Sequence, residues 1–239
     1  MLCRNLSFTI RNQESWALLG RNGAGKTTLL HCILGIIKPT EGSIAIDSVP
    51  LQTYTRRELA KRVGILFQDE TNSLPATVLE SVLLGRHPYP KPFFRDCPED
   101  LRSVEDLLRE LSLERIKNRK IGSLSGGEMQ RVAIAMLLAQ EPSIFLLDEP
   151  NNNLDVGYQI NLLEALKHKI NKKKGSILMA THDINFAARF CEYFILFLNK
   201  DEILIGNKQE ILSTQNLSKA YDCQISSISA EDKTFFYPT

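Results

Sequence analysis

Several features that mark whole classes of protein are missing from this sequence. The longest uninterrupted apolar run covers only residues 132–139, far fewer than the roughly 20 that a membrane-spanning helix needs. The start of the chain has no charged segment followed by an apolar one, so we expect no secretory signal. The net charge is only +1, which gives no overall field to attract nucleic acid or an acidic surface.

Cysteine pairs are also missing. The chain has five cysteines, an odd number, and no two of them have C-x-x-C spacing. Their scattered positions favour reduced, buried thiols in a cytosolic protein over disulfides or a zinc site. The short basic run 171–175 (NKKKG) is most simply a solvated helix end, with cations and a glycine at the C-terminus. We therefore expect no nucleic-acid partner.

The composition that remains is that of an ordinary globular protein, with 43% hydrophobic and 24% charged residues. Short continuous apolar runs alternate with helical patterns, which predicts a parallel sheet covered on both faces. We expect strands at 6–10, 16–19, 43–46, 63–67, 144–147, 177–180, 193–198 and 203–205. We expect helices at 27–34, 55–62, 78–84, 99–111, 125–140 and 156–170.

One part of the chain has a different texture. Between residues 69 and 142 helical patterns dominate, broken by the proline-rich loop 87–92, which indicates a helical insertion into an α/β core. We predict a single domain over 1–239, with its core in 1–68 and 143–221, a helical subdomain in 69–142 and a short tail in 222–239. We expect the fold class to be α/β, with helices on both faces of a mostly parallel sheet and a small antiparallel β region. A glycine-rich segment at 20–28 of the type that binds phosphate makes the expected core that of a P-loop NTPase.

The segment 20–28 (GRNGAGKTT) fits the nucleotide-binding pattern G-x-x-x-x-G-K-[ST] at every fixed position. Glycines allow a tight turn whose N–H groups face phosphate oxygens, and the following helix adds its partial positive charge. A glycine-rich turn with a chance lysine is the alternative, but an apolar strand precedes the segment and a helix follows it. The candidate nucleotide-binding residues are Gly20, Asn22, Gly23, Ala24, Gly25, Lys26, Thr27 and Thr28. Lys26 would reach the β- and γ-phosphates, and Thr27 would bind Mg²⁺.

Two carboxylates, Asp148 and Glu149, follow the buried strand at 144–147. The carboxyl edge of an open α/β sheet is where ligands bind. Asp148 suits a place in the Mg²⁺ shell, and Glu149 suits a general base that activates the attacking water. The alternative is a strand that merely leaves the core through acidic residues.

The segment 124–128 (LSGGE) allows two interpretations that are compatible with each other. Ser125 and Glu128 have the spacing of a helix capping box. The adjacent Gly126 and Gly127 contribute little to a cap, but they suit a helix N-terminus whose N–H groups are open to an anion.

Together these motifs resemble those of the ATP-binding subunits of ABC transporters, over nearly the whole chain. Segments 20–28, 144–149 and 124–130 are similar to the family's Walker A, Walker B and signature motifs. The resemblance also implies that Gln68 is the Q-loop glutamine, which contacts Mg²⁺ and nucleotide, and that 153–155 is the D-loop, with Asp155 at the nucleotide. It implies that His182 is the switch histidine at the γ-phosphate, so that the catalytic residues are Glu149, His182 and Lys26.

The resemblance has further implications for cofactors and partners. The family binds ATP and Mg²⁺ in a head-to-tail dimer, with each nucleotide between one copy's phosphate loop and the partner copy's Ser125–Gly127. Permease subunits would hold the chain at the cytoplasmic face of the cell membrane, and a periplasmic or surface substrate-binding protein would deliver the cargo. Three alternatives to an importer ATPase remain. They are the ATPase of an ABC exporter, a soluble ABC protein that acts on DNA or ribosomes, and a module that binds ATP without hydrolysing it.

A narrower resemblance concerns the importer subgroup. Residues 84–89 (LGRHPY) are similar to the G-R-x-P stretch of importer ATPases that serve ferric siderophores, haem and vitamin B12. The tail segments 217–221 and 235–238 resemble that subgroup's C-terminus. The alternative is a generic surface loop and a packed hydrophobic tail. The chain resembles an importer ATPase, and the resemblance implies an iron chelate or cobalamin as cargo.

The family also places a strand and an adenine-stacking aromatic residue upstream of the segment that matches 5–10. We therefore expect the sequence to be short at its N-terminus, through a misplaced start or a real truncation. Phe8 and Trp16 are expected to be core residues. Adenine would then lose a stacking partner, at a cost of about 1 kcal/mol.

Overall fold

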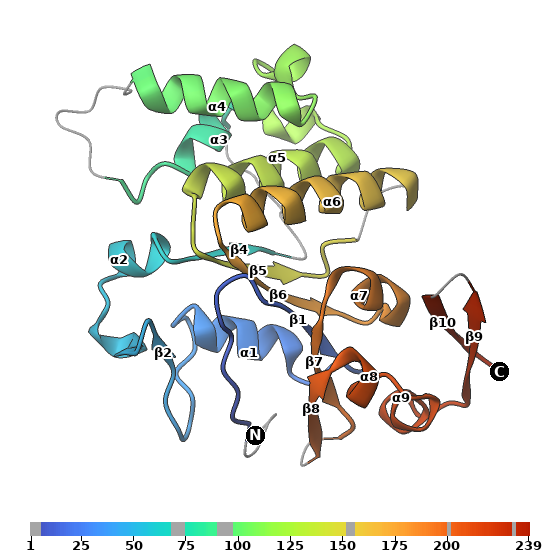
Figure 1. The fold of residues 1–239 in the computed structure, drawn as a ribbon. Coiled ribbons are helices and arrows are strands. Elements are labelled where there is room, and N and C mark those ends of the chain that lie inside the picture. The colour runs from blue at the N-terminus through green and yellow to red at the C-terminus, as the bar shows by residue number, and fades with distance from the viewer. Residues whose placement is uncertain (1–5, 68–74, 90–97, 152–155, 200–201, 231–232) are drawn as a thin grey trace. The chain divides into compact units, whose positions relative to one another are not determined.

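The computed structural model describes residues 6–67, 75–89, 98–151, 156–199, 202–230 and 233–239. They divide between two compact units, the first with Met1–Ser43, Leu146–Glu149 and Ile170–Thr239, and the second with Ile44–Phe145 and Pro150–Lys169. A six-stranded sheet has the order β4-β5-β6-β1-β7-β8, and two small sheets have two strands each (Figure 1). The predicted α/β class, with a mostly parallel sheet, small antiparallel sheets and helical insertion, is confirmed.

The first unit is built around strand β1. It pairs in parallel with β6 on one side and β7 on the other, and β8 continues the sheet in antiparallel pairing with β7. Every residue of β1 and β6 is buried, because parallel strands have both faces covered. The elements of this unit are β1 (Ser15–Leu19), α1 (Lys26–Ile33), most of β5 (Ile144–Asp148), β6 (Ser176–Thr181), α7 (Ile184–Phe190), β7 (Tyr193–Phe197), β8 (Ile203–Asn207), α8 (Lys208–Ile211), α9 (Thr214–Tyr221), β9 (Ile225–Ala230) and β10 (Lys233–Pro238).

The second unit is mainly helical. Helix α3 contacts both α4 and α5, and Figure 1 shows these three helices side by side. Gly85 permits this approach, because a Cβ added there would lie 2.4 Å from the Met136 carbonyl oxygen. The elements are β2 (Ala45–Ile46), β3 (Val49–Pro50), η1 (Leu51–Thr53), α2 (Arg56–Ala60), β4 (Val63–Leu66), α3 (Val78–Leu84), α4 (Pro98–Glu110), η2 (Glu114–Ile116), η3 (Ile121–Ser123), α5 (Gly126–Gln140) and most of α6 (Val156–Lys172).

One expected strand is not formed. Burial along 6–10 alternates as predicted, with Leu6, Phe8 and Ile10 half-buried and the residues between them exposed. None of the described strands pairs with this segment, and a strand needs a neighbouring ladder for its backbone hydrogen bonds. The alternating pattern therefore indicated correctly which side chains are partly buried, but it did not indicate that the segment pairs with another strand.

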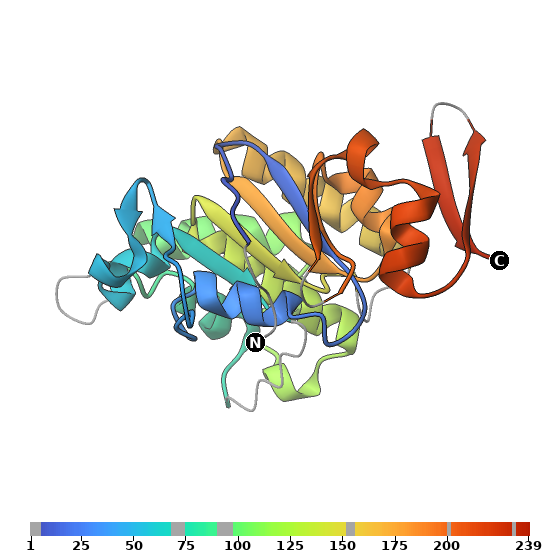
Figure 2. The ribbon, with the colours of Figure 1, turned by 90° about the horizontal axis from the view of Figure 1, so that it is seen from below.

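The C-terminal segment has more structure than its sequence suggested. Strands β9 and β10 form an antiparallel hairpin, red in Figure 2, which contacts α9 and α7. Asn185 on α7 anchors the hairpin, because its side-chain amide donates to the Phe236 carbonyl and its oxygen accepts from the Phe236 N–H, both at 2.8 Å. The predicted boundaries of core, helical subdomain and tail remain a prediction.

Two expectations from composition concern cysteines and membranes. Among the described cysteines, Cys32, Cys191 and Cys223 are not in disulfides. Cys191 is buried as expected, whereas Cys223 is exposed, because it follows the C-terminal end of α9 rather than lying in a core element. No helix in the described part of the chain is long and apolar enough to cross a membrane.

Candidate functional site

The glycine-rich segment 20–28, called the phosphate loop below, connects β1 to α1. Gly25 is the N-cap of α1 with φ +102°, and it provides no side-chain cap to the helix. At the other end of the loop Gly20 has φ +150°, and a Cβ there would lie 3.0 Å from the Phe197 Cβ. The first N–H groups of α1 therefore remain open to an anion, as a phosphate-binding turn requires.

Lys26 is 7% exposed and folds back over the loop. Its Nζ donates to the Gly20 carbonyl at 2.8 Å and to the Arg21 carbonyl at 3.3 Å. Burial lowers the pKa of Lys26, while the Glu149 and Asp148 carboxylates act in the opposite direction. The structure thus brings the predicted phosphate-binding lysine together with both predicted acidic residues.

Asp148 ends β5 and is only 2% exposed. The Thr27 side chain hydrogen-bonds to it, and burial raises the pKa of its carboxyl group. Its Oδ1 has no hydrogen-bond partner among the described residues. A buried carboxylate oxygen with free lone pairs beside a threonine hydroxyl fits Mg²⁺, which prefers oxygen ligands.

Among the described residues no three His, Cys, Asp or Glu side chains gather in a way that could hold a metal ion. Mg²⁺ usually keeps several waters and takes one or two carboxylates together with substrate phosphates, so Asp148 and Thr27 remain the candidate ligands for it.

Glu149 has a left-handed backbone, with φ 47°, which costs a non-glycine residue about 1–2 kcal/mol. Its N–H donates to the Ala180 carbonyl at 2.8 Å. Its Oε2 accepts from the Thr181 hydroxyl at 3.1 Å and lies 3.0 Å from the His182 Nδ1. Backbone strain of this kind concentrates at functional sites, and here it directs the carboxylate to the histidine.

The contact between Glu149 and His182 was not predicted from the sequence, although both residues were. Thr181 is fully buried, and its hydroxyl also accepts from the Asp183 N–H at 3.2 Å. Asp183 in turn caps α7 by accepting from the Phe186 N–H at 2.9 Å. The sequence signal for Thr181 was its place between a buried strand and a histidine.

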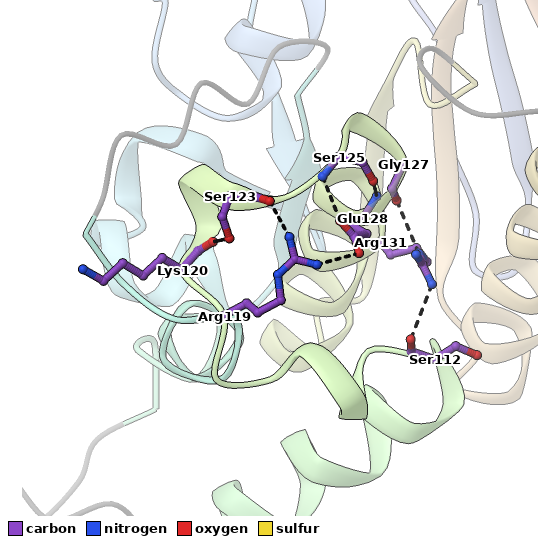
Figure 3. A network of polar contacts seen from close by, with 8 residues as sticks. All are labelled: Ser112, Arg119, Lys120, Ser123, Ser125, Gly127, Glu128 and Arg131. Carbon is purple, nitrogen blue, oxygen red and sulfur yellow. Dashed lines mark hydrogen bonds and ion pairs between the residues drawn. The ribbon is translucent and has the colours of Figure 1, made fainter.

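The signature segment belongs to the second unit, where the capping box is confirmed (Figure 3). The Ser125 Oγ accepts from the Glu128 N–H at 3.3 Å, and the Glu128 Oε2 accepts from the Ser125 N–H at 2.8 Å. That backbone N–H is the main reason why the pKa of Glu128 is lowered. The Ser125 side chain is therefore held at the start of α5, directly before the two glycines.

Arginine side chains surround this cap. The Arg119 Nη1 lies 3.1 Å from the Glu128 Oε1, and its Nη2 donates to the Ser123 carbonyl. Arg131 contacts the Gly127 and Ser112 carbonyls, each at 3.4 Å (Figure 3). These contacts connect the start of α5 to the turn that precedes it.

Two of the predicted site residues cannot be placed. Gln68 lies in 68–74 and Asp155 in 152–155, both outside the described residues. Their expected roles at the nucleotide stay predictions. Trp16 is placed and is buried as predicted, with its ring stacked on Tyr193 at a centroid distance of 4.9 Å.

Comparisons with known proteins agree with these motifs. The family model described as ABC transporter matches residues 3–152. The chain is 35% identical to the ferric enterobactin transport ATP-binding protein of Escherichia coli K12, over 92% of this chain and 81% of that protein. It is 34% identical to the petrobactin import ATP-binding protein of Bacillus subtilis 168, over 92% of this chain and 86% of the relative.

Solved structures of ABC transporters are also similar to this chain. A transporter described as metal-chelate type, in an inward-facing conformation, has a chain that matches with a TM-score of 0.83 and 28% identity, covering 98% of this chain and 89% of that one. A dimeric bacterial ABC transporter cassette matches with a TM-score of 0.72 and 34% identity, covering 81% and 85%.

Proposed function

The chain belongs to the ABC transporter family and is an ATPase of that family, and from this premise we propose that it uses Mg²⁺-ATP to power the import of an iron chelate. The observation that carries the proposal is the cluster of Lys26, Asp148, Glu149 and His182 at the end of the phosphate loop and the carboxyl ends of β5 and β6. The groups proposed to bind phosphate, to bind Mg²⁺ and to transfer a proton therefore lie at one sheet edge.

The phosphate loop is the proposed binding site for the nucleotide. The open N–H groups at the start of α1 would face the phosphates, and the Lys26 ammonium would move from the loop carbonyls to the β- and γ-phosphate oxygens. Thr27 and Asp148 would hold Mg²⁺, with Gln68 as a further proposed ligand. When bound, Mg²⁺ would neutralise charge on the phosphate oxygens.

Glu149 and His182 are the residues proposed to act in hydrolysis. Glu149 accepts a proton from, or orients, the water that attacks the γ-phosphate. The hydrogen bond from the Thr181 hydroxyl and the contact with the His182 Nδ1 fix the Glu149 carboxylate in place. His182 is half-exposed, at 55% of its side chain, so its ring can reach both Glu149 and a γ-phosphate.

The working unit is a head-to-tail dimer attached to a permease. In it Ser125, Gly126 and Gly127 at the start of α5, together with Asp155, contact the nucleotide of the partner copy. The dimeric form of the similar cassette supports this arrangement. The permease holds the dimer at the cytoplasmic face of the membrane, and a substrate-binding protein supplies the cargo.

The names of the relatives support an iron chelate as cargo, because they specify ferric enterobactin transport and petrobactin import. A siderophore is therefore the first candidate, with haem next. Cobalamin is the second cargo class, supported by the G-R-x-P resemblance alone. An exporter role has no such support.

The test begins with Glu149→Gln, which keeps the size of the side chain and removes its basic function. We expect hydrolysis to fall by at least 100-fold and gel filtration with ATP and Mg²⁺ to show a stable dimer. Glu114→Gln, at an exposed glutamate, is the matched control and should behave as wild type. A wild-type rate in Glu149→Gln would exclude Glu149 as the base.

The cargo is tested in cells that carry this chain with its neighbouring permease and binding-protein genes. Uptake of a radiolabelled ferric siderophore that depends on Glu149 supports the proposal. Uptake of cobalamin without uptake of the ferric siderophore would contradict the proposal and identify cobalamin as the cargo.

A further inference from the structure

The C-terminal end of α9 lies close to both the phosphate loop and the segment that contains His182. The Tyr221 hydroxyl donates to the His182 carbonyl at 3.1 Å. The backbone of Gly20, the first residue of the phosphate loop, is close enough to this hydroxyl to lower its pKa, although burial raises that pKa more. One side-chain oxygen therefore donates to the His182 segment and lies near the start of the phosphate loop.

Helix α9 is firmly anchored, so its last residue has a defined position. Leu217 is fully buried and Ala220 is 1% exposed. The Ser213 Oγ caps the helix by accepting from the Asn216 N–H at 3.1 Å. At the other end, the Ser218 Oγ accepts from the Ile225 N–H at 2.9 Å.

The hydroxyl is well suited to a fixed bridge. Burial raises the pKa of Tyr221 well above its usual range, so the hydroxyl stays protonated and keeps its donor at physiological pH. A second contact next to it, an ion pair of 3.1 Å between Asp222 and Arg21, is largely exposed and contributes little. Unlike this ion pair, the Tyr221 hydroxyl contacts the segment of His182.

We propose that Tyr221 is a positioning residue for ATP hydrolysis, and that its hydroxyl fixes the His182 backbone relative to the phosphate loop. The proposal rests on the role given to His182 above. With its carbonyl held by Tyr221 and its ring held by Glu149, His182 has little freedom to leave the γ-phosphate. Misplacement of such a group lowers the rate of the chemical step more than it lowers ground-state binding.

The first variant is Tyr221→Phe, which removes one oxygen and leaves the ring. We expect kcat to fall about three- to tenfold, the loss that one hydrogen bond predicts, while the KM for ATP changes less than twofold. Tyr237→Phe, at a 40% exposed tyrosine of β10, is the matched control and should leave kcat unchanged. Tyr221→4-aminophenylalanine, which keeps a donor on the ring, should recover part of the lost rate.

A double-variant cycle separates positioning from simple stability. If Tyr221 acts through His182, Tyr221→Phe causes no further loss of kcat in a His182→Ala background. An additive loss there, or a wild-type kcat in Tyr221→Phe, would overturn the inference and leave the proposed ATPase mechanism standing. A wild-type kcat in His182→Ala would overturn both the histidine's role and this inference.

Discussion

The arginine of the G-R-x-P stretch allows a quantitative prediction. Arg86 follows α3, and its Nε lies 2.8 Å from the Asp100 Oδ1. Its Nη1 donates to the Ala139 carbonyl at 2.8 Å and to the Glu141 Oε2 at 2.9 Å. The guanidinium also covers the Tyr89 ring, 4.2 Å from its centroid. The stretch is thus a half-buried anchor between α3, α4 and the end of α5, not a generic surface loop.

Burial determines how much the anchor contributes. The Arg86 and Asp100 side chains are 13% and 12% exposed, while Glu141 is 35% exposed. Burial alone would lower the pKa of Arg86, but the hydrogen bonds that its guanidinium donates to Glu141 and Asp100, together with the charges of these carboxylates, outweigh burial and the pKa is raised. Removing one partner of a buried pair leaves the other desolvated and costs about 3–5 kcal/mol.

We expect Arg86→Met to lower the free energy of unfolding by about 3 kcal/mol, at the lower end of that range because Glu141 is partly solvated and methionine keeps the apolar stem. Urea unfolding followed by circular dichroism measures the loss. The control is Arg109→Met, whose pair with Asp106 is 56% and 63% exposed and should contribute at most about 1 kcal/mol. Equal losses in the two variants would refute the burial argument.

Two further predictions concern the site. Ser125→Arg should abolish cooperative hydrolysis and leave ATP affinity of the isolated chain nearly unchanged, as measured by calorimetric titration; a fall in affinity as large as that of Lys26→Ala would place this helix in the same copy's site. Asp148→Asn should raise stability at pH 7 without nucleotide, because burial raises the pKa of Asp148, so that wild-type stability is lost as pH rises from the unfolded pKa to the folded one. The same variant should lose the thermal stabilisation that Mg²⁺-ATP gives the wild type, and a wild-type thermal shift would exclude Asp148 as a metal ligand.

Local rules in the sequence determined the helix starts and the phosphate loop. The spacing of Ser125 and Glu128 predicted a capping box, and the box is formed. The apolar run at 16–19 predicted β1 within one residue. These features depend on residues a few positions apart, so neighbouring side chains and backbone groups suffice to specify them.

Tertiary structure alone decided which of these groups meet. Glu149 and His182 are 33 positions apart and touch because the segments after β5 and β6 come together at one sheet edge. Tyr221 lies 39 positions from His182, and no motif in the tail indicated their contact. The strand expected at 6–10 is not formed, and the reason is again tertiary. The alternating pattern specifies which side chains are buried, but a strand also needs a partner strand, and only the folded chain decides whether one lies beside it.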